Sequence, residues 1–296
     1  MSIITRRLRP DDAADWSALL SLAASVGFDR VPQRLRSSWT MSGPLTACYG
    51  VHQDDELVAS IMFIGQGIRY AGKTGTAYQS CWIMVRPQHQ GGPWLGLVYR
   101  KAMREFAREG AKFIFGFPNS VASPVFSSNA SVNVLPMRRN YFLLRGPAML
   151  LAKQWDAARC EAVQASPGLV HFDQRPICEW KRHEHPGLIS LEDGANFVWG
   201  RIERRPVAGL GSITLLLAGG CEVGNPSGFM RLAARMRDQH RIDMIRFVSP
   251  EGSVVSRAGR FGRSAPRTES FTYIPLVKDL PASIAFDVCT GLKSMF

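Results

Sequence analysis

The sequence of 296 residues lacks the features that define several protein classes. Its six cysteines include no C-x-x-C pair, so no redox motif is present and scattered, buried thiols in a reducing compartment are expected. No apolar run approaches the roughly 20 residues that cross a bilayer. The first ten residues carry charge without a following apolar stretch, unlike a secretory signal. We therefore expect a cytoplasmic protein that does not enter a membrane.

Familiar catalytic motifs are also missing. The chain contains no G-x-S-x-G elbow, no H-E-x-x-H zinc motif and no G-x-x-x-x-G-K-[ST] phosphate loop. His171, Cys178, His183 and His185 occur within a short stretch, but their spacing is not that of a zinc site. We predict loop histidines there and no bound metal.

Positive charge is in excess, but it is spread along the whole sequence. The formal net charge is +12, and such a surface attracts phosphates, acidic carrier proteins, nucleic acid or anionic membranes. No block of five or six consecutive like charges occurs. An arginine-rich surface without a specific role explains the charge equally well, so both interpretations stay open.

Hydrophobic patterning predicts alternating strands and helices. Helices are expected from Asp11 or Asp12 to Gly27, over Pro93–Gly110, from Asn225-Pro226 onward, and over Ser253–Arg260. Asp54–Asp55 should form a turn, and Gly65–Gly67 with Gly72 should separate two further strands. The expected strands are Ile3–Leu8, Thr46–His52, Leu57–Ile64, Ala77–Val85, Lys112–Phe117, Arg139–Leu144, Phe197–Ile202, Ile213–Leu217, Met244–Val248, Phe271–Leu276 and Ile284–Cys289.

The two halves of the chain share an order of elements. In each half, strands lead into a long helix, then a strand, a short helix and two more strands, which is a weak internal repeat. The pattern lapses over Ala152–Pro167, so we place a boundary there and predict domains at 1–155 and 156–296. Strands linked by helices predict an α/β fold with mixed sheets flanked by helices.

The most informative stretch joins the strand ending at Val85 to the helix beginning near Pro93. Free backbone N–H groups and the positive dipole end at such a helix start form a cradle for a diphosphate. Gly91 and Gly92 allow a phosphate to approach the backbone, and Gln88 and Gln90 can add donors. An ordinary turn between a strand and a helix is the alternative.

This stretch resembles the acyl-CoA-binding signature of the GNAT superfamily, V-x-P followed by Q/R-x-x-G-x-G/A. Val85 and Pro87 match the lead-in, Gln88 the first position and Gly91 the first glycine. Pro93 departs from the pattern, because it stands where a Gly or Ala belongs and removes one N–H donor. The resemblance implies that these residues bind the diphosphate of acetyl-CoA or another acyl-CoA.

Two further segments extend the resemblance. In Gly116-Phe117-Pro118-Asn119 the family's strand splays from its neighbour, and the resemblance gives Asn119 a hydrogen bond to the pantetheine arm. Capping of a following helix is the alternative role for Asn119. Glu179–His183 looks like the segment that opens the second unit of tandem GNAT proteins. The second unit is then a degenerate copy that shapes the acceptor cleft.

The residues that usually carry protons in GNAT enzymes are missing from this sequence. Many GNAT enzymes use a Glu on the strand before the phosphate loop and a Tyr after the Asn, but this strand has no carboxylate and Phe126 stands at the Tyr position. The candidates are Ser80 or Cys81 with ordered water, or Asp287 from the second half. Cys81 fits core packing better than covalent catalysis. Trp94 can stack on adenine or anchor its helix.

The resemblance implies an N-acyltransferase that transfers an acetyl group to the amine of a small metabolite, such as an amino sugar or amino acid. Aminoacyl transfer of the Fem type is a narrower version, and an acyl carrier protein can be the donor's partner. The alternative is a non-catalytic GNAT-fold regulatory protein, associated with nucleic acid. The missing Glu and Tyr favour that alternative, whereas the absence of a DNA-binding motif counts against nucleic acid.

Overall fold

The fold is described from a computed structural model of the chain. The structure describes residues 2–28, 35–36, 39–40, 46–118, 131–144, 168–207, 211–224, 226–250, 253–254, 265–278, 280 and 284–287. It divides the chain into two compact units. Unit 1 comprises Met1–Gly67, Gly75–Gly116 and Tyr273–Asp279, and unit 2 comprises Ile68–Thr74, Phe117–Thr272 and Leu280–Phe296. The predicted boundary between residues 155 and 156 lies outside the described residues.

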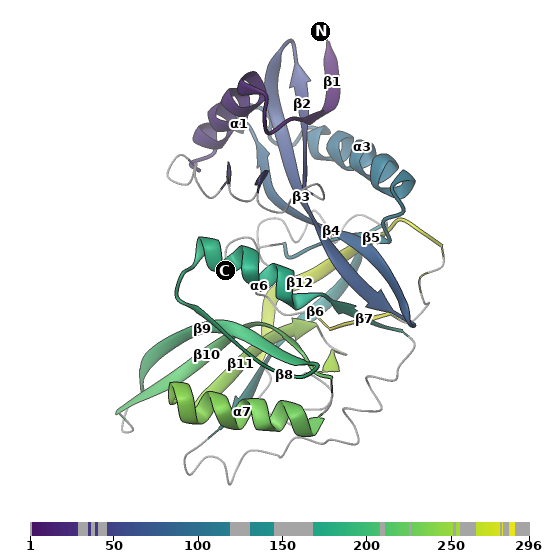
Figure 1. The fold of residues 1–296 in the computed structure, drawn as a ribbon. Helices are drawn as coiled ribbons and strands as arrows, with labels where there is room; N and C mark the ends of the chain where they lie inside the picture. Colours follow the sequence, from purple (N-terminus) through teal and green to yellow (C-terminus); the bar gives the residue numbers. More distant parts are fainter. Residues whose placement is uncertain are drawn as a thin grey trace. The chain divides into compact units, whose positions relative to one another are not determined.

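Unit 1 is a mixed sheet with a helix on each side (Figure 1). Its elements are β1 (Ile3–Leu8), α1 (Ala13–Ser25), β2 (Ala47–Gln53), β3 (Glu56–Tyr70), β4 (Lys73–Val85), the 3-10 turn η2 (Pro87–His89), α3 (Trp94–Arg108) and β5 (Phe113–Gly116). The strands lie in the order β1-β2-β3-β4-β5. β1 and β3 run antiparallel to β2, whereas β5 runs parallel to β4, because α3 carries the chain back between them.

Helices α1 and α3 form as the sequence predicts. Asp12 caps α1, since its carboxylate accepts from the backbone N–H groups of Ala14 and Asp15. Helix α3 buries one face, made by Trp94, Val98, Ala102 and Phe106, against the sheet. The ring of Phe106 stacks on Tyr78 of β4 with centroids 3.7 Å apart. This packing fixes α3 against the strand that precedes it.

Unit 2 repeats this order of elements. Its elements are β6 (Asn133–Leu143), β7 (Leu169–Phe172), α6 (Gln174–Glu184), β8 (Leu188–Asp193), β9 (Asn196–Val207), β10 (Gly211–Glu222), α7 (Pro226–His240), β11 (Met244–Pro250), β12 (Ala265–Pro275) and β13 (Ala285–Asp287). β8, β9 and β10 pair antiparallel, α7 follows, and β11 returns parallel to β10. The series from β7 to β11 thus matches the series from β1 to β5.

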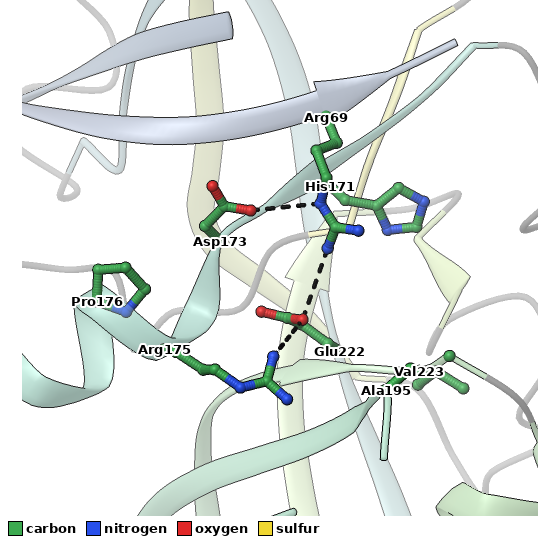
Figure 2. A pocket seen from close by; sticks show the side chains of 9 residues that line it. Arg69, His171, Asp173, Arg175, Pro176, Ala195, Glu222 and Val223 are labelled. Atoms are coloured by element: carbon green, nitrogen blue, oxygen red, sulfur yellow. Dashed lines mark hydrogen bonds and ion pairs between the residues drawn. The ribbon is translucent and has the colours of Figure 1, made fainter. Parts of the chain in front are cut away.

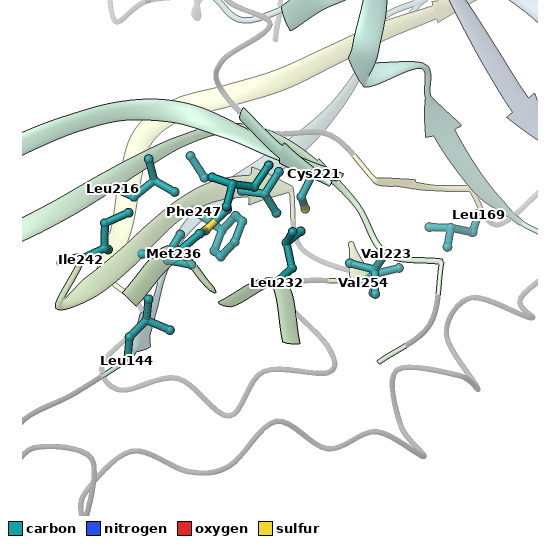
Figure 3. Packing of buried hydrophobic residues seen from close by; sticks show 14 residues of the cluster. Leu144, Leu169, Leu216, Cys221, Val223, Leu232, Met236, Ile242, Phe247 and Val254 are labelled. Atoms are coloured by element: carbon teal, nitrogen blue, oxygen red, sulfur yellow. The ribbon is translucent and has the colours of Figure 1, made fainter. Parts of the chain in front are cut away.

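The core of unit 2 lies under α7 (Figure 3). Leu232 and Met236 of α7 are buried against Leu216, Ile245 and Phe247 of the sheet. Burial of large apolar side chains such as these is the main favourable term in folding. A second core, separate from that of unit 1, therefore supports the predicted internal repeat.

Each unit is made of segments that are far apart in the sequence. β6 follows β5 along the chain, yet it pairs antiparallel with β11 in unit 2. In return, Tyr273 at the end of β12 belongs to unit 1, where its ring contacts Phe113. Strands β3 and β4 likewise place their connecting hairpin, Ile68–Thr74, in unit 2.

The mixed α/β class is confirmed, but several details of the sequence prediction are wrong. Gly65–Gly67 does not interrupt β3, which continues to Tyr70. The turn is Ala71-Gly72, where both residues have positive φ, 47° and 73°. Two such residues in succession match the twist of a tight hairpin, whereas the earlier glycines adopt strand geometry.

Unit 2 also contains elements that the sequence did not indicate. β7, α6 and β8 occupy the stretch that was expected to be polar loop. The short lengths of β7 and β8, four and six residues, explain why periodicity missed them. The helix that Asn119 is alternatively expected to cap lies outside the described residues, as does all but Ser253 and Val254 of the helix expected over Ser253–Arg260.

Candidate functional site

The predicted phosphate-binding segment is a strand, a 3-10 turn and a helix start. Arg86 holds the turn in place: its backbone N–H donates to Val58 and its Nε donates to the carbonyl of Leu57 at 2.9 Å. The same guanidinium pairs with Glu56 at 3.0 Å. An arginine that binds a backbone carbonyl forms no sequence motif, so this role of Arg86 could not be recognised from the sequence alone.

Backbone N–H groups gather at the start of α3. Within the turn, His89, Gln90 and Gly92 donate to carbonyls three residues earlier. Among the residues that the structure describes, Gly91 and the first three residues of α3, Trp94–Gly96, find no backbone acceptor for their N–H groups. Such groups at a helix start, together with the helix dipole, suit an anionic ligand.

The two glycines of the turn have different roles. Gly91 has φ +83°, and a Cβ built on it meets nothing within 4 Å, so the space beside it is open. A Cβ on Gly92 would lie 2.3 Å from Nε1 of Trp94. Gly92 is therefore needed for the indole to pack, and only Gly91 offers an unobstructed approach. Gln88 and Gln90 are exposed beside it, and Val85 is half-buried at the strand end.

Trp94 belongs to the hydrophobic core. It is 7% exposed, packs within the cluster under α3, and meets the ring of His89 edge-on at 5.5 Å. This burial supports its interpretation as a helix anchor rather than an adenine platform.

Strands β4 and β5 pair over only part of their lengths. The parallel register joins Ala77–Gln79 to Phe113–Phe115 and ends there, although β4 continues to Val85. At the end of the register the Ser80 hydroxyl donates to the carbonyl of Phe115 at 3.2 Å. Trp82 then adopts φ +48°, an uncommon backbone conformation for a large residue in a strand. The register ends at Phe115, one residue before β5 itself ends at Gly116, so the splaying of the two strands that the resemblance implies stays a prediction.

The catalytic candidates fall in different units. Ser80 and Cys81 are 9% and 5% exposed on β4 in unit 1, whereas Asp287 lies on β13 in unit 2. Burial raises the pKa of the neighbouring Cys48 thiol, and the charge of Cys81 raises it further. This environment disfavours a thiolate nucleophile. Asn119 and Phe126 lie outside the described residues, so the role of Asn119 stays a prediction.

Unit 2 contains a pocket of about 670 Å³ that the sequence analysis did not predict (Figure 2). Its charged side chains come from the ends of several elements. Arg69 pairs with Asp173 at 3.3 Å and with Glu222 at 3.6 Å, and Arg175 pairs with Glu222 at 2.9 Å. The pocket is lined by Arg69, His171, Asp173, Arg175, Pro176, Ala195, Glu222, Val223 and Gly224. These residues come from four separate stretches of the sequence, which is why no motif indicates the pocket.

The described residues hold neither a cluster of metal ligands nor a membrane-spanning helix. No group of three or more His, Cys, Asp or Glu side chains is placed to hold a metal ion in the described part of the chain. None of its described helices is long and apolar enough to cross a membrane. The four described cysteines are buried and free, consistent with the predicted scattered thiols.

Comparisons with known proteins identify the fold. Residues 5–126 match the acetyltransferase (GNAT) domain family. No curated protein matches the sequence. Among solved structures, a GCN5-related N-acetyltransferase from Anabaena variabilis is similar with a TM-score of 0.58 and 8% identity, over 93% of this chain and 73% of that one.

Two other solved structures have the same fold. A GCN5-related N-acetyltransferase from Kribbella flavida has a TM-score of 0.53 at 13% identity, over 92% of this chain and 70% of that one. Eis1 from Mycobacterium abscessus has the same score, identity and coverage of this chain, over 73% of its own length. The family match spans the segment from β1 through β5, with the turn at Gly91. Residues 5–126 of this chain thus match a GNAT acetyltransferase domain, and the solved structures share its fold.

Proposed function

We propose that this protein is an acyl-CoA-dependent N-acyltransferase that transfers an acetyl or other acyl group to the amine of a small metabolite, such as an amino sugar or amino acid. The observation that carries this proposal is the family match over residues 5–126, which includes the β4–turn–α3 segment. In that segment Gly91 and the N–H groups of α3 are open to an anion. The CoA diphosphate is the anion that the family match implies there.

The reaction forms one amide bond and breaks one thioester. The amine nitrogen attacks the thioester carbonyl carbon, the C–S bond breaks, and the CoA thiolate leaves. The nitrogen must be neutral to attack, and it then loses one proton while the thiolate gains one, so a group or a water molecule must carry that proton even when the amine is neutral. No carboxylate occurs over Tyr78–Trp82. Ser80 and Cys81 with water, and Asp287, stay the candidates in this chain.

Several features support a second copy of the fold in the chain. Unit 2 has the element order of unit 1 and its own core. The solved structures cover more than 90% of the chain, at 92% or 93%. The residues that precede α7 do not have the spacing of the phosphate-binding signature found at Gly91. We propose that unit 2 is a degenerate GNAT-like unit and that unit 1 alone binds the acyl donor.

Calorimetric titration with acetyl-CoA at physiological salt tests the proposal. We expect saturable binding to the native chain. Gly91→Trp should weaken it by about tenfold or more, because the indole fills the approach to the helix start. Gly110→Trp is the matched control. It stands at the other end of α3 with φ +81° and the same open surroundings, so it carries the same backbone strain without blocking the cradle.

Activity is measured by thiol release from acetyl-CoA with a panel of amino sugars and amino acids. Release that depends on the amine supports the enzyme. Saturable CoA binding without release from any acceptor would favour the non-catalytic alternative, which the missing carboxylate on β4 motivates. A parallel titration with duplex DNA completes the test: salt-sensitive DNA binding without CoA binding overturns the acyltransferase proposal.

A further inference from the structure

Two residues that line the pocket of unit 2, Arg69 and His171, belong to a row of three side chains across three strands. Arg69 at the end of β3 faces His171 of β7 in the antiparallel register. His171 in turn faces Asp287 of β13 in the parallel register. Residues that face one another across neighbouring strands project on the same side of the sheet. The three side chains therefore lie side by side, with the histidine in the middle.

The histidine is oriented by the aspartate. Nδ1 of His171 lies 3.2 Å from Oδ2 of Asp287, whose side chain is 4% exposed. A carboxylate only accepts hydrogen bonds, so a neutral His171 carries its proton on Nδ1. Its Nε2 is then left as an acceptor. Because His171 lines the pocket and is 27% exposed, this acceptor is within reach of a ligand.

The remaining charges of the pocket largely cancel one another. Glu222 is 13% exposed; its Oε1 accepts from the backbone N–H of Gln174 at the start of α6, and its Oε2 accepts from Arg175. Arg69 pairs with Asp173 and also approaches Glu222. Two guanidinium groups thus balance two carboxylates within the lining.

The buried carboxylate of Asp287 is the charge left over. It contacts His171 but is not itself part of the lining, so it adds one negative charge next to a lining that is otherwise balanced when His171 is neutral. Glu192, which approaches Arg175 at 3.4 Å and is exposed, adds to the negative side. Negative charge in a partly enclosed site favours a cationic ligand, since burial weakens solvent screening.

We propose that this pocket binds a small ligand through a protonated amine. The ammonium group donates to Nε2 of His171 and to the carboxylate of Asp173, whose Oδ1 is taken by Arg69 while Oδ2 is available as a second acceptor. A pocket of this volume accommodates a metabolite rather than a single ion. The site is assigned to unit 2 by itself, and it does not depend on acyl-CoA binding in unit 1.

The test compares amines with alcohols of the same shape in the absence of acyl-CoA. The probes are glucosamine against glucose, and 1,5-diaminopentane against 1,5-pentanediol, each titrated to millimolar concentration. The readout is the imidazole signal of His171 in protein labelled at histidine, assigned by its loss in His171→Gln, together with calorimetry. We expect at least one amine to shift the His171 signal saturably, and its alcohol to leave the signal unchanged.

Variants separate a binding site from a structural ion-pair network. Asp287→Asn removes the buried charge beside His171 and should weaken amine binding by about tenfold, because that charge attracts the ammonium group and orients its acceptor His171. Asp193→Asn is the control, because Asp193 pairs with Arg231 at 3.0 Å outside the pocket. Asp173→Asn, at a side chain that is 43% exposed, provides a second test if Asp287→Asn unfolds.

Three outcomes overturn the proposal. The first is that neither amine perturbs His171. The second is that amine and alcohol bind equally, which would mean that the charge is not recognised. The third is that folded Asp287→Asn and Asp173→Asn bind the amine as tightly as the native chain does. Loss of binding in both variants with retention in Asp193→Asn supports it, whatever the acetyl-CoA titration of unit 1 shows.

Discussion

The guanidinium group of Arg6 in β1 donates two hydrogen bonds to the carboxylate of Asp15 in α1. Asp15 is 1% exposed and also accepts from the backbone N–H of Arg9. Burial raises the pKa of Asp15. The hydrogen bonds from Arg6 and Arg9 and the charge of Arg6 together lower it by more, so the pKa of Asp15 is below its ordinary value. The ion pair between Arg6 and Asp15 therefore links α1 to β1, and the buried carboxylate of Asp15 depends on Arg6 to stay charged.

This pair predicts a dependence of stability on pH. Because the pKa of Asp15 is lower in the folded state, its contribution is full above the unfolded pKa of about 3.9 and is lost as the pH falls through the folded value. Asp15→Asn should lower the free energy of unfolding at pH 7 by about 2 kcal/mol. Urea denaturation between pH 7 and pH 3 should show a smaller acid loss for this variant than for the native chain. Asp11→Asn, at an exposed position, should change neither quantity.

Cys81 should behave as a core residue. It is 5% exposed on β4, so Cys81→Ala should lower stability by about 1 to 2 kcal/mol and leave thiol release from acetyl-CoA within about threefold of the native rate. Cys48→Ala, at a position 1% exposed on β2, is the matched control for packing. Complete loss of release in folded Cys81→Ala, with Cys48→Ala active, would instead give Cys81 a part in the reaction, as a proton carrier or as a nucleophile.

The hairpin between β3 and β4 offers a stabilising change. Ala71 has φ 47°, a conformation that costs an alanine about 1 kcal/mol, and it is exposed. Ala71→Asn should raise the free energy of unfolding by about 0.5 kcal/mol, because asparagine tolerates this conformation and Asn-Gly favours the hairpin turn. Gly72→Ala should have the opposite effect. Thermal unfolding of the two variants checks the pair, and equal midpoints would contradict the turn geometry.

Gly219 in β10 is required by packing rather than by a ligand. The register of β9 and β10 shifts between Ala218 and Gly220, and a Cβ on Gly219 would lie 2.2 Å from the ring of Trp199, which is fully buried. Gly219→Ala should therefore destabilise the protein by about 1 to 3 kcal/mol in urea denaturation. Gly187→Ala meets nothing within 4 Å and should be nearly neutral. Equal stability of both variants would show that the bulge relaxes freely.

Local sequence patterns were sufficient to predict the elements that depend only on neighbouring residues. Asp12 and Gly110 mark helix ends by capping chemistry, and the apolar stripe of α3 needs no tertiary information to be recognised. The same is true of the turn at Gly91 as a candidate anion site. Gly65–Gly67 misled the prediction, because a glycine can break a strand or sit within one, and its neighbours across the sheet decide which.

The sequence by itself determined the class of the fold, the position of the strand–turn–helix segment, and the resemblance of residues 85–91 to an acyl-CoA signature. Those features depend on residues close together in the chain. Only the tertiary structure showed that Gly92 serves Trp94, that β4 and β5 pair no further than Gln79, and that Arg69, His171 and Asp287 form one row. Such relationships arise from register between strands distant in sequence, and register is set by the packing of the whole sheet.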